Sequence, residues 1–126
     1  MKKLLMLLCL LVIMTACNKD AKIFHCNLFI YSEHGIIFEE TGIAFTAGDT
    51  VLDILKNATR EARIHMEYTG AGITAYVKGI DNLYEFDKGP DSGWVYYVND
   101  ERVGESAGSY TPADGDYIFW RYLITP

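Results

Sequence analysis

Basic residues, cysteine and proline are all scarce in this sequence. Among 126 residues there are 11 Lys and Arg against 17 Asp and Glu, with three Cys and three Pro, and the formal net charge is −6. So acidic a chain lacks the positive surface that neutralises phosphates, which excludes nucleic acid as a partner. Internal repeats and low-complexity segments are missing too, and the length suits one small domain with a modest core.

Motifs for catalysis and metal binding are also lacking. The three histidines, His25, His34 and His65, show no metal-ligand spacing such as His-Glu-x-x-His. No cysteine is paired by motif with a histidine, and we expect no nucleophile elbow, so the protein is predicted not to be an enzyme. The acidic loop of residues 81–91 could offer oxygen ligands to calcium, but its spacing does not follow the Asp-x-Asp-x-Asp-Gly loop. We interpret that loop as solvated.

The N-terminus has an apolar run, but a short one. Met1-Lys2-Lys3 is positive, and residues 4–16 follow without a charged side chain. A spanning helix needs about 20 apolar residues, so this run predicts a signal peptide over residues 1–16. The run ends Thr15-Ala16-Cys17, which resembles a lipobox. We therefore expect acyl chains on Cys17 that anchor the protein on the outer face of the cell membrane.

Two other interpretations of this run stay open: an ordinary secretory peptide cleaved after Ala16, and an uncleaved short anchor. In the lipoprotein interpretation, residues 17–21 form a tether with lipidated Cys17, and residues 22–126 form the single domain. Cys9 then leaves with the signal and Cys17 becomes a thioether, so no intramolecular disulfide can form. We expect Cys26 to be a small buried side chain in a strand.

Alternation of apolar and polar residues predicts several strands. In residues 22–31, one face would hold Phe24, Cys26, Leu28 and Ile30. Residues 36–45 are expected to pair with this strand as a hairpin. Further strands are expected at residues 64–68, 73–77, 94–99, 102–103 and 117–122, with a polar loop at 79–93.

Apolar residues at helical spacing point to one convincing helix. It would hold Val51, Leu52, Leu55, Ala58 and Ala62 on its inner face, behind a Thr or Asp cap. One helix laid on a mixed, curled sheet is a β-grasp-like arrangement. The predicted fold class is therefore α+β, in a small single domain.

Aromatic residues crowd the second half of the chain, more than a one-layer core can bury. On a strand, Trp94 and Tyr96 share one face while Val95 and Tyr97 share the other. One pair should lie under the helix and the other should face out. Exposed Trp and Tyr commonly form binding surfaces, although they also simply cover an open sheet, and both interpretations stay open.

The second half resembles the C-terminal β-domain of transcobalamin and intrinsic factor, and the stand-alone bacterial domains similar to it. The resemblance covers most of the chain from about Lys22. It rests on Thr50-Val51-Leu52-Asp53-Ile54-Leu55, Tyr76-Val77-Lys78-Gly79-Ile80, Ser92-Gly93-Trp94-Val95-Tyr96-Tyr97-Val98-Asn99, Gly104, Ala107, Tyr110-Thr111-Pro112, Asp114-Gly115-Asp116 and the strand ending Trp120-Arg121-Tyr122. Asn99-Asp100 stands where the bacterial relatives commonly have Asn-Gly.

This resemblance implies a β-grasp-like, non-enzymatic fold of the ligand-binding kind, with no cofactor. In the vitamin carriers the domain closes over one side of cobalamin, while a large helical domain, not expected in this chain, covers the other. Carried over by position, the ligand-binding residues would be Trp94, Tyr96, Tyr76, Glu101, Arg102, Val103 and Gly104. The implied ligand is cobalamin or another corrinoid.

Our leading hypothesis is a membrane-anchored surface lipoprotein that binds a small ligand and works with a transporter or partner protein. Stacking by exposed Trp and Tyr would hold the ligand, with hydrogen bonds from backbone groups of the Gly-rich turns. The alternative is a cell-surface interaction or spacer domain that binds protein or envelope polymer through a sheet edge, without a small ligand.

Overall fold

The computed structural model describes residues 22–125. The predicted signal peptide, the tether and the lipidation site at Cys17 lie outside the described residues, so they stay predictions. Within the described part, one α-helix and eight strands form a small α+β domain, which confirms the predicted fold class. No helix of residues 22–125 has the length and apolar character needed to cross a membrane.

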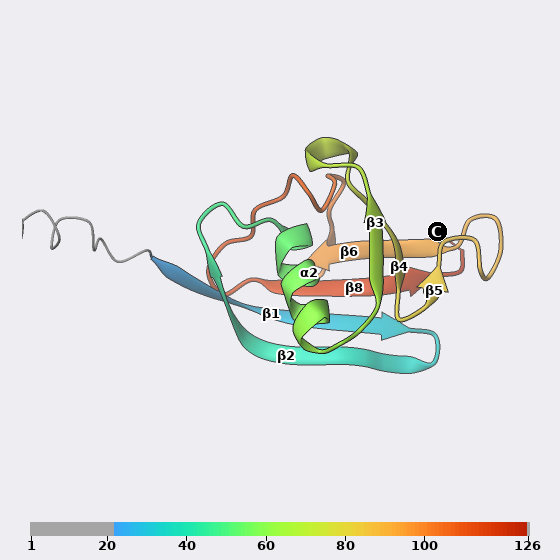
Figure 1. Cartoon of the computed structure of the whole chain (residues 1–126), viewed down its shortest axis with the longest axis horizontal. Coiled ribbons are helices and arrows are strands. Elements are labelled where there is room, and N and C mark those ends of the chain that lie inside the picture. The colour runs from blue at the N-terminus through green and yellow to red at the C-terminus, as the bar shows by residue number, and fades with distance from the viewer. Residues whose placement is uncertain (1–21, 126) are drawn as a thin grey trace, which may run out of the picture.

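Eight strands form two sheets (Figure 1). The strands are β1 (Ile23–Ser32), β2 (Gly35–Thr46), β3 (Met66–Thr69), β4 (Tyr76–Ile80), β5 (Leu83–Tyr84), β6 (Gly93–Val98), β7 (Glu101–Arg102) and β8 (Tyr117–Leu123). The larger sheet has the order β2-β1-β8-β6-β7, and the smaller has the order β3-β4-β5. The closing strand β8 runs parallel to β1 and antiparallel to β6, so the larger sheet is mixed.

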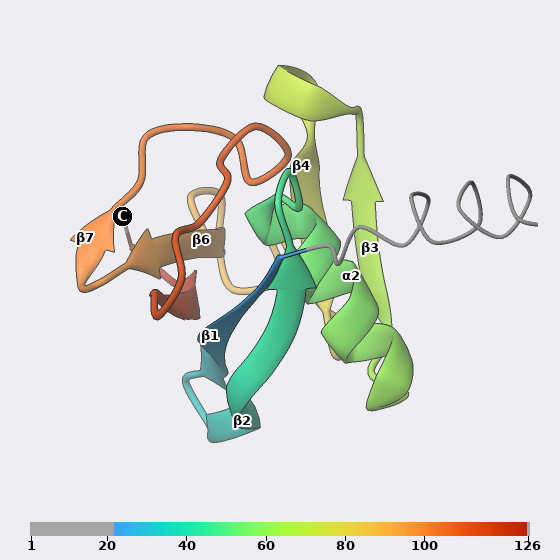
Figure 2. The ribbon, with the colours of Figure 1, turned by 90° about the vertical axis from the view of Figure 1, so that its left-hand side faces the viewer.

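The helix and the small sheet lie on the same side of the large sheet. In Figure 2, α2 (Val51–Glu61), β3 and β4 stand on one side, and β1, β2, β6 and β7 on the other. The core fills the space between these layers. It includes Leu28 and Ile30 of β1, Leu55 of α2 and Ile118 of β8, none of which has measurable solvent exposure.

The predicted face of β1 is confirmed, because Cys26, Leu28 and Ile30 are buried and Phe24 packs against the core. Cys26 is a free, buried thiol, as expected. Burial and the nearby Asp116 carboxylate raise the pKa of Cys26 to about 11, which keeps it protonated near neutral pH.

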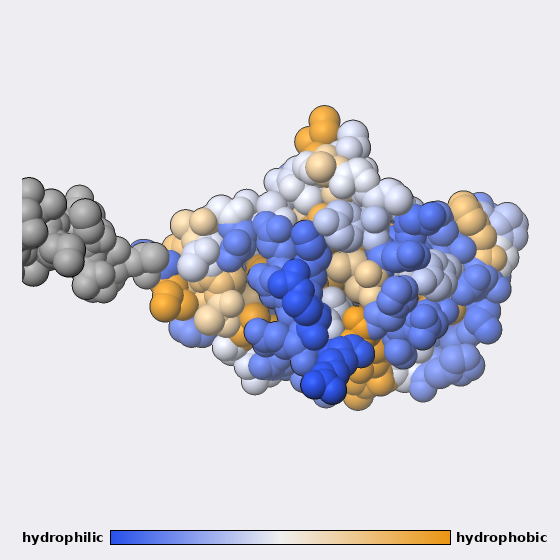
Figure 3. Space-filling view, in the orientation of Figure 1, coloured by the Kyte–Doolittle hydropathy of each residue, from blue (hydrophilic) through white to orange (hydrophobic). Residues whose placement is uncertain are grey.

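Helix α2 begins at a capping box, as its sequence predicts. The Asp53 amide donates to Thr50 Oγ1 at 3.2 Å, and the Thr50 amide donates to the Asp53 carboxylate at 2.9 Å. Two further amides of the first turn, those of Val51 and Leu52, donate to the carbonyls of Tyr110 and Ala107. The helix start therefore holds the 107–110 segment in place. Figure 3 shows a largely hydrophilic surface over α2, which agrees with a helix whose other face is buried.

The predicted strands at 64–68 and 73–77 are wrong in their bounds. The chain forms β3 at 66–69, a 3₁₀ turn at Gly72–Thr74, and β4 only from Tyr76. Gly70 and Gly72 have φ of 75° and 55°, and the Thr74 hydroxyl donates to the Ala71 carbonyl at 2.9 Å. This closed turn uses residues that β propensity alone assigns to a strand.

The predicted polar loop at 79–93 also needs correction, because it contains β5. Asp81 and Asn82 both have positive φ, 55° and 60°, which is the backbone of a tight hairpin turn between β4 and β5. The neighbouring Gly79 lies under the Tyr84 ring, where an added Cβ would come within 2.6 Å of that ring. The remaining strand predictions differ from the structure by one or two residues.

Candidate functional site

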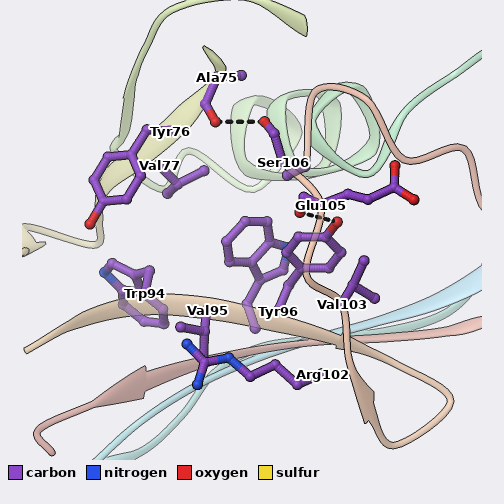
Figure 4. A pocket seen from close by; sticks show the side chains of 12 residues that line it. Ala75, Tyr76, Val77, Trp94, Val95, Tyr96, Arg102, Val103, Glu105 and Ser106 are labelled. Carbon is purple, nitrogen blue, oxygen red and sulfur yellow. Dashed lines mark hydrogen bonds between the residues drawn. The ribbon is translucent and has the colours of Figure 1, made fainter. Parts of the chain in front are cut away.

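A cavity of about 150 Å³ lies beside the part of β6 that β7 does not pair (Figure 4). One wall comes from residues 94–96 of β6 and Trp120 of β8. The facing wall comes from Ala75 and the first two residues of β4. Arg102 of β7 and, after it, residues 103 and 105–107 close the end. The site therefore joins the edges of the two sheets.

Cross-strand packing fixes the inner wall. Trp94 and Tyr96 alternate with Val95 along β6, so both point toward the layer of α2 and the small sheet, and they are only 5% and 6% exposed. The Trp94 indole Nε1 donates to the Leu83 carbonyl at 2.8 Å, and the Tyr96 hydroxyl donates to the Glu105 carbonyl at 2.8 Å.

This burial corrects one expectation for Trp94 and Tyr96. We predicted a ligand held by stacking on exposed Trp and Tyr, but these two rings lie on the covered face of the large sheet. They form the cavity wall instead, so a ligand would meet them only by entering the cavity. Tyr76 is 45% exposed and stands at the opening.

The structure brings together most, but not all, of the residues predicted for the ligand site. Tyr76, Trp94, Tyr96, Arg102 and Val103 all line the cavity. Glu101 and Gly104 do not line it.

Glu101 is exposed on the short edge strand β7, opposite Val98. Gly104 is also exposed, and an added Cβ there would meet no atom within 4 Å. Both were carried over as part of the continuous 101–104 segment, whereas only Arg102 and Val103 of that segment line the cavity.

Trp120 lines the cavity but was not among the residues predicted for the ligand site. It lies opposite Tyr96 across β6 and β8, with the two ring centres 5.2 Å apart, and it is 2% exposed. Among the described residues, its Nε1 is the one buried side-chain nitrogen or oxygen without a hydrogen-bond partner. The alternation of β8 places Trp120 on the buried face with Ile118 and Tyr122, but alternation does not reveal an unpaired N–H.

Ser106 also escaped prediction, and it fastens the segment that closes the cavity. Its hydroxyl oxygen lies 2.6 Å from the Ala75 carbonyl oxygen and 3.0 Å from that of Gly72. Gly108 packs so closely on this turn that an added Cβ would come within 2.6 Å of both the Ala75 Cβ and the Gly72 carbonyl oxygen. The closing segment is thus joined to the start of β4.

Residues Gly104-Glu105-Ser106-Ala107-Gly108 match the Gly-x-Ser-x-Gly pattern, although we expect no nucleophile elbow. A nucleophile elbow places its serine on a sharp turn from a strand into a helix, within reach of a histidine. Here Ser106 lies in an irregular segment after β7, and its hydroxyl faces backbone carbonyls. The serine of this pattern therefore fastens the closing segment to the facing turn.

The tyrosines around the cavity are neutral near physiological pH. Burial, with the Glu105 carboxylate nearby, raises the pKa of Tyr96 well above its ordinary value. Burial and a hydrogen bond with Glu85 raise the pKa of Tyr76. Arg102 forms no ion pair with any residue that the structure describes. It is exposed, it pairs with Tyr97, and its side chain lies along Val95 (Figure 4).

The opposite face of the large sheet carries a second aromatic group, which we call the open aromatic face. It consists of Phe29, Tyr31, Tyr97, Tyr117 and Phe119, all partly exposed. Phe29 stacks on Tyr117 with ring centres 4.6 Å apart, and Tyr31 lies 5.0 Å from Phe119. The rings partly cover one another, so this face is a continuous aromatic surface.

The three histidines do not meet. His25 is on β1, His34 is in the turn after it, and His65 precedes β3, where its Nε2 lies 2.9 Å from the Tyr84 hydroxyl. Among residues 22–125, no three His, Cys, Asp or Glu side chains are grouped so that they could hold a metal ion.

Comparison with known proteins gives a family match and two fold relatives. A family model described as "Domain of unknown function (DUF4430)" matches residues 48–123, and no curated protein matches the chain. A crystal structure of haptocorrin in complex with Cbi superposes with a TM-score of 0.64 at 17% identity, over 86% of this chain. This chain spans 27% of the haptocorrin chain.

A second relative is a protein from Ruminococcus gnavus ATCC 29149 that has been suggested to bind metal. Its crystal structure superposes with a TM-score of 0.56 at 18% identity, over 79% of this chain and 96% of that one. At such identities both likenesses describe the fold and leave the ligand open.

Proposed function

We propose the following function for this chain, which belongs to the family described as "Domain of unknown function (DUF4430)": it is a non-enzymatic module that binds a small ligand in the cavity beside β6. The observation that carries the proposal is the cavity itself, an aromatic-walled recess at the junction of two sheets. Binding sites are typically concave and largely apolar, with a few placed polar groups.

A corrinoid is the ligand class that we propose. Haptocorrin, whose structure was determined in complex with Cbi, has this fold in part of its chain. The 150 Å³ cavity is smaller than the roughly 300–1,000 Å³ of sites that enclose whole drug-sized ligands. The cavity would therefore take one side group of a corrinoid, while the ring system lies outside against Tyr76 and Arg102.

We further propose that the module works at a membrane. Acyl chains on Cys17 would anchor it to the outer face of the cell membrane, and the four residues 18–21 would reach at most about 14 Å when extended. A binding domain held so close to the bilayer is well placed to deliver its ligand to a transporter or another surface protein.

Titration of the full chain with cobalamin and with cobinamide tests the small-ligand proposal. Trp94 and Trp120 are the two tryptophans of the chain and both line the cavity, so ligand entry should change intrinsic fluorescence saturably. Circular dichroism of the same sample would establish that the protein is folded. A folded protein with no saturable change up to high micromolar ligand would end the corrinoid proposal.

A second candidate function is favoured by the open aromatic face. Its five rings lie on the side of the large sheet opposite α2, where they could bind a protein or an envelope polymer without a small ligand. Capture of a partner from solubilised membranes by wild-type protein, reduced by Tyr97→Ala and unaffected by added corrinoid, would support this candidate. Capture that requires the corrinoid, or that Tyr97→Ala leaves unchanged, would count against it.

A further inference from the structure

We infer that the hollow between α2 and β3 binds a phosphate ester, and that Lys56 and Arg60 hold its phosphate group. The hollow has a volume of about 300 Å³ and is lined by residues 56, 59, 60, 64–66 and 68. It shares no lining residue with the cavity beside β6, so this is a second site beyond the proposed function.

Positive side chains gather at this hollow although the chain as a whole has a net charge of −6. Lys56 and Arg60 lie one turn apart on α2, and His65 follows in the connection to β3. Among the described residues, no Asp or Glu lines the hollow, and neither Lys56 nor Arg60 forms an ion pair. An anion would therefore meet positive charge here without displacing a carboxylate.

The carboxylates nearest in sequence are directed elsewhere. Glu61 lines a different hollow, between β2 and α2. Burial and a hydrogen bond with Glu67 raise the pKa of Tyr84, and the Tyr84 hydroxyl also lies 2.9 Å from His65 Nε2. Because the hydroxyl gives its one proton to the Glu67 carboxylate, His65 Nε2 donates to the hydroxyl oxygen. This bond holds the imidazole at the rim of the hollow.

The C-terminal end of α2 does not present free carbonyl groups that would repel an anion. The carbonyls of residues 58–60 all accept hydrogen bonds from amides of residues 62–64. The Thr59 side chain is 2% exposed, and its hydroxyl donates to the Leu55 carbonyl at 2.7 Å. The positive charges of Lys56 and Arg60 therefore dominate the polar part of the hollow.

The floor of the hollow is apolar. Ile64 and Met66 are partly buried and pack against the core. Tyr68 forms one side, and Lys56 Nζ lies 4.9 Å from the centre of its ring, which keeps this ammonium group at the hollow. An anion that carries an apolar group can contact this floor, whereas an inorganic anion leaves it empty. A hollow of about 300 Å³ is at the lower end of small-ligand sites.

Phosphate matches this pair of cations better than a carboxylate does. A phosphate monoester carries nearly two negative charges near neutral pH and three terminal oxygens, so it can accept from an ammonium and a guanidinium at once. A soluble phosphate ester and the headgroup of a phospholipid share this chemistry.

Calorimetry of the full chain tests the site with three probes: phenyl phosphate, inorganic phosphate and phenol. Phenyl phosphate should give saturable heat, inorganic phosphate should bind more weakly, and phenol should not bind. Arg60→Gln should weaken phenyl phosphate binding by about tenfold or more, because it removes a charge-assisted hydrogen bond. No saturable heat from phenyl phosphate with the folded wild type, or equal binding of phenol, would overturn the inference.

Arg121→Gln is the matched control. It removes the same charge from an exposed residue of β8 that does not line the hollow, so it should change phenyl phosphate binding by less than about twofold. Both variants alter exposed side chains, and circular dichroism would establish that they are folded. Equal weakening by Arg60→Gln and Arg121→Gln would show a general charge effect and overturn the assignment.

Two further probes separate the sources of the phosphate. Glycerol 3-phosphate represents a soluble ester, and dihexanoyl phosphatidylglycerol below its micelle concentration represents a lipid headgroup. Binding of either one that Arg60→Gln weakens supports the site, and the tighter of the two identifies the source. Failure of both, together with phenyl phosphate, would overturn it.

The phosphate site and the proposed corrinoid site can fail independently. Cobinamide binding should be the same in Arg60→Gln and in the wild type, because the two sites share no residue. If phenyl phosphate binds and cobinamide does not, the phosphate site stands and the corrinoid proposal fails. If cobinamide binds and phenyl phosphate does not, the phosphate site is overturned and the corrinoid proposal stands.

Discussion

The two tryptophans of the cavity wall provide a matched pair for a stability experiment. Trp94 and Trp120 are buried to a similar degree, but only Trp94 Nε1 has a hydrogen-bond partner, the Leu83 carbonyl at 2.8 Å. Replacement of either by phenylalanine contracts the ring by the same amount. The difference between the two variants therefore isolates the energetics of the indole N–H.

The expected difference follows from the bonding of each indole. Trp94→Phe removes a hydrogen bond and leaves the Leu83 carbonyl without this donor, which costs about 1–3 kcal/mol. Trp120→Phe removes an unpaired buried N–H, so it relieves a desolvation penalty of about the same size. We expect Trp94→Phe to be less stable than Trp120→Phe by about 2–6 kcal/mol, although Trp120 is the more buried residue.

Urea unfolding of the full chain, followed by far-ultraviolet circular dichroism, measures this difference without relying on tryptophan fluorescence. Equal m-values for the two variants would establish that only the free energy of unfolding changed. If Trp120→Phe destabilises the protein as much as Trp94→Phe, the Trp120 N–H is bonded in the folded protein without any ligand. The statement that the buried Trp120 N–H has no hydrogen-bond partner would then be refuted.

Three other predictions concern the closing segment, the open aromatic face and the anchor. Gly108→Ala should lower the free energy of unfolding by about 1–3 kcal/mol in the same urea assay, because the added Cβ would lie 2.6 Å from atoms of the adjoining turn. The control Gly104→Ala should change this free energy by less than about 0.5 kcal/mol. Equal effects of the two variants would contradict the close packing of Gly108. Tyr31 donates to the Glu39 carboxylate, which raises its pKa to about 12, so its stabilising contribution is complete below about pH 10 and is lost as the pH rises through about 12. Tyrosinate absorbance should show this group titrating earlier in Glu39→Gln, and an unchanged titration would contradict the cause given. Cys17→Ser should abolish fatty-acid incorporation and membrane association, and retention of both would refute the lipoprotein proposal.

Much of the fold could be predicted from local sequence patterns, because alternation of apolar and polar residues indicates which side of a strand or helix is buried. The alternation in β1 marks the face that the core covers, and the Thr50–Asp53 capping box marks the start of α2. The 3₁₀ turn at Gly72–Thr74 was missed because it depends on positive φ at two glycines and on a Thr74 side-chain bond. These features belong to the folded backbone, and the β propensity of the sequence does not reveal them.

The residues of the cavity could be predicted only in part, because their surroundings depend on contacts between segments far apart in the sequence. The resemblance pointed to Trp94, Tyr96 and Arg102, and these residues do lie together. Alternation predicts that Trp94 and Tyr96 share one face of β6, but it does not predict that α2 and the small sheet cover this face. The contribution of Trp120 depends on the pairing of β6 with β8, which joins residues 20 or more positions apart.

Calorimetry of cobinamide binding to a cavity-filling variant tests whether a small ligand enters the cavity beside β6. Val103→Trp would fill the cavity, while Ile36→Trp places the same side chain on a residue of β2 that is 59% exposed and does not line it. We expect saturable heat for the wild type and for Ile36→Trp, and its loss in a folded Val103→Trp. Undiminished binding by Val103→Trp, or no saturable heat from the folded wild type, would show that cobinamide does not enter this cavity.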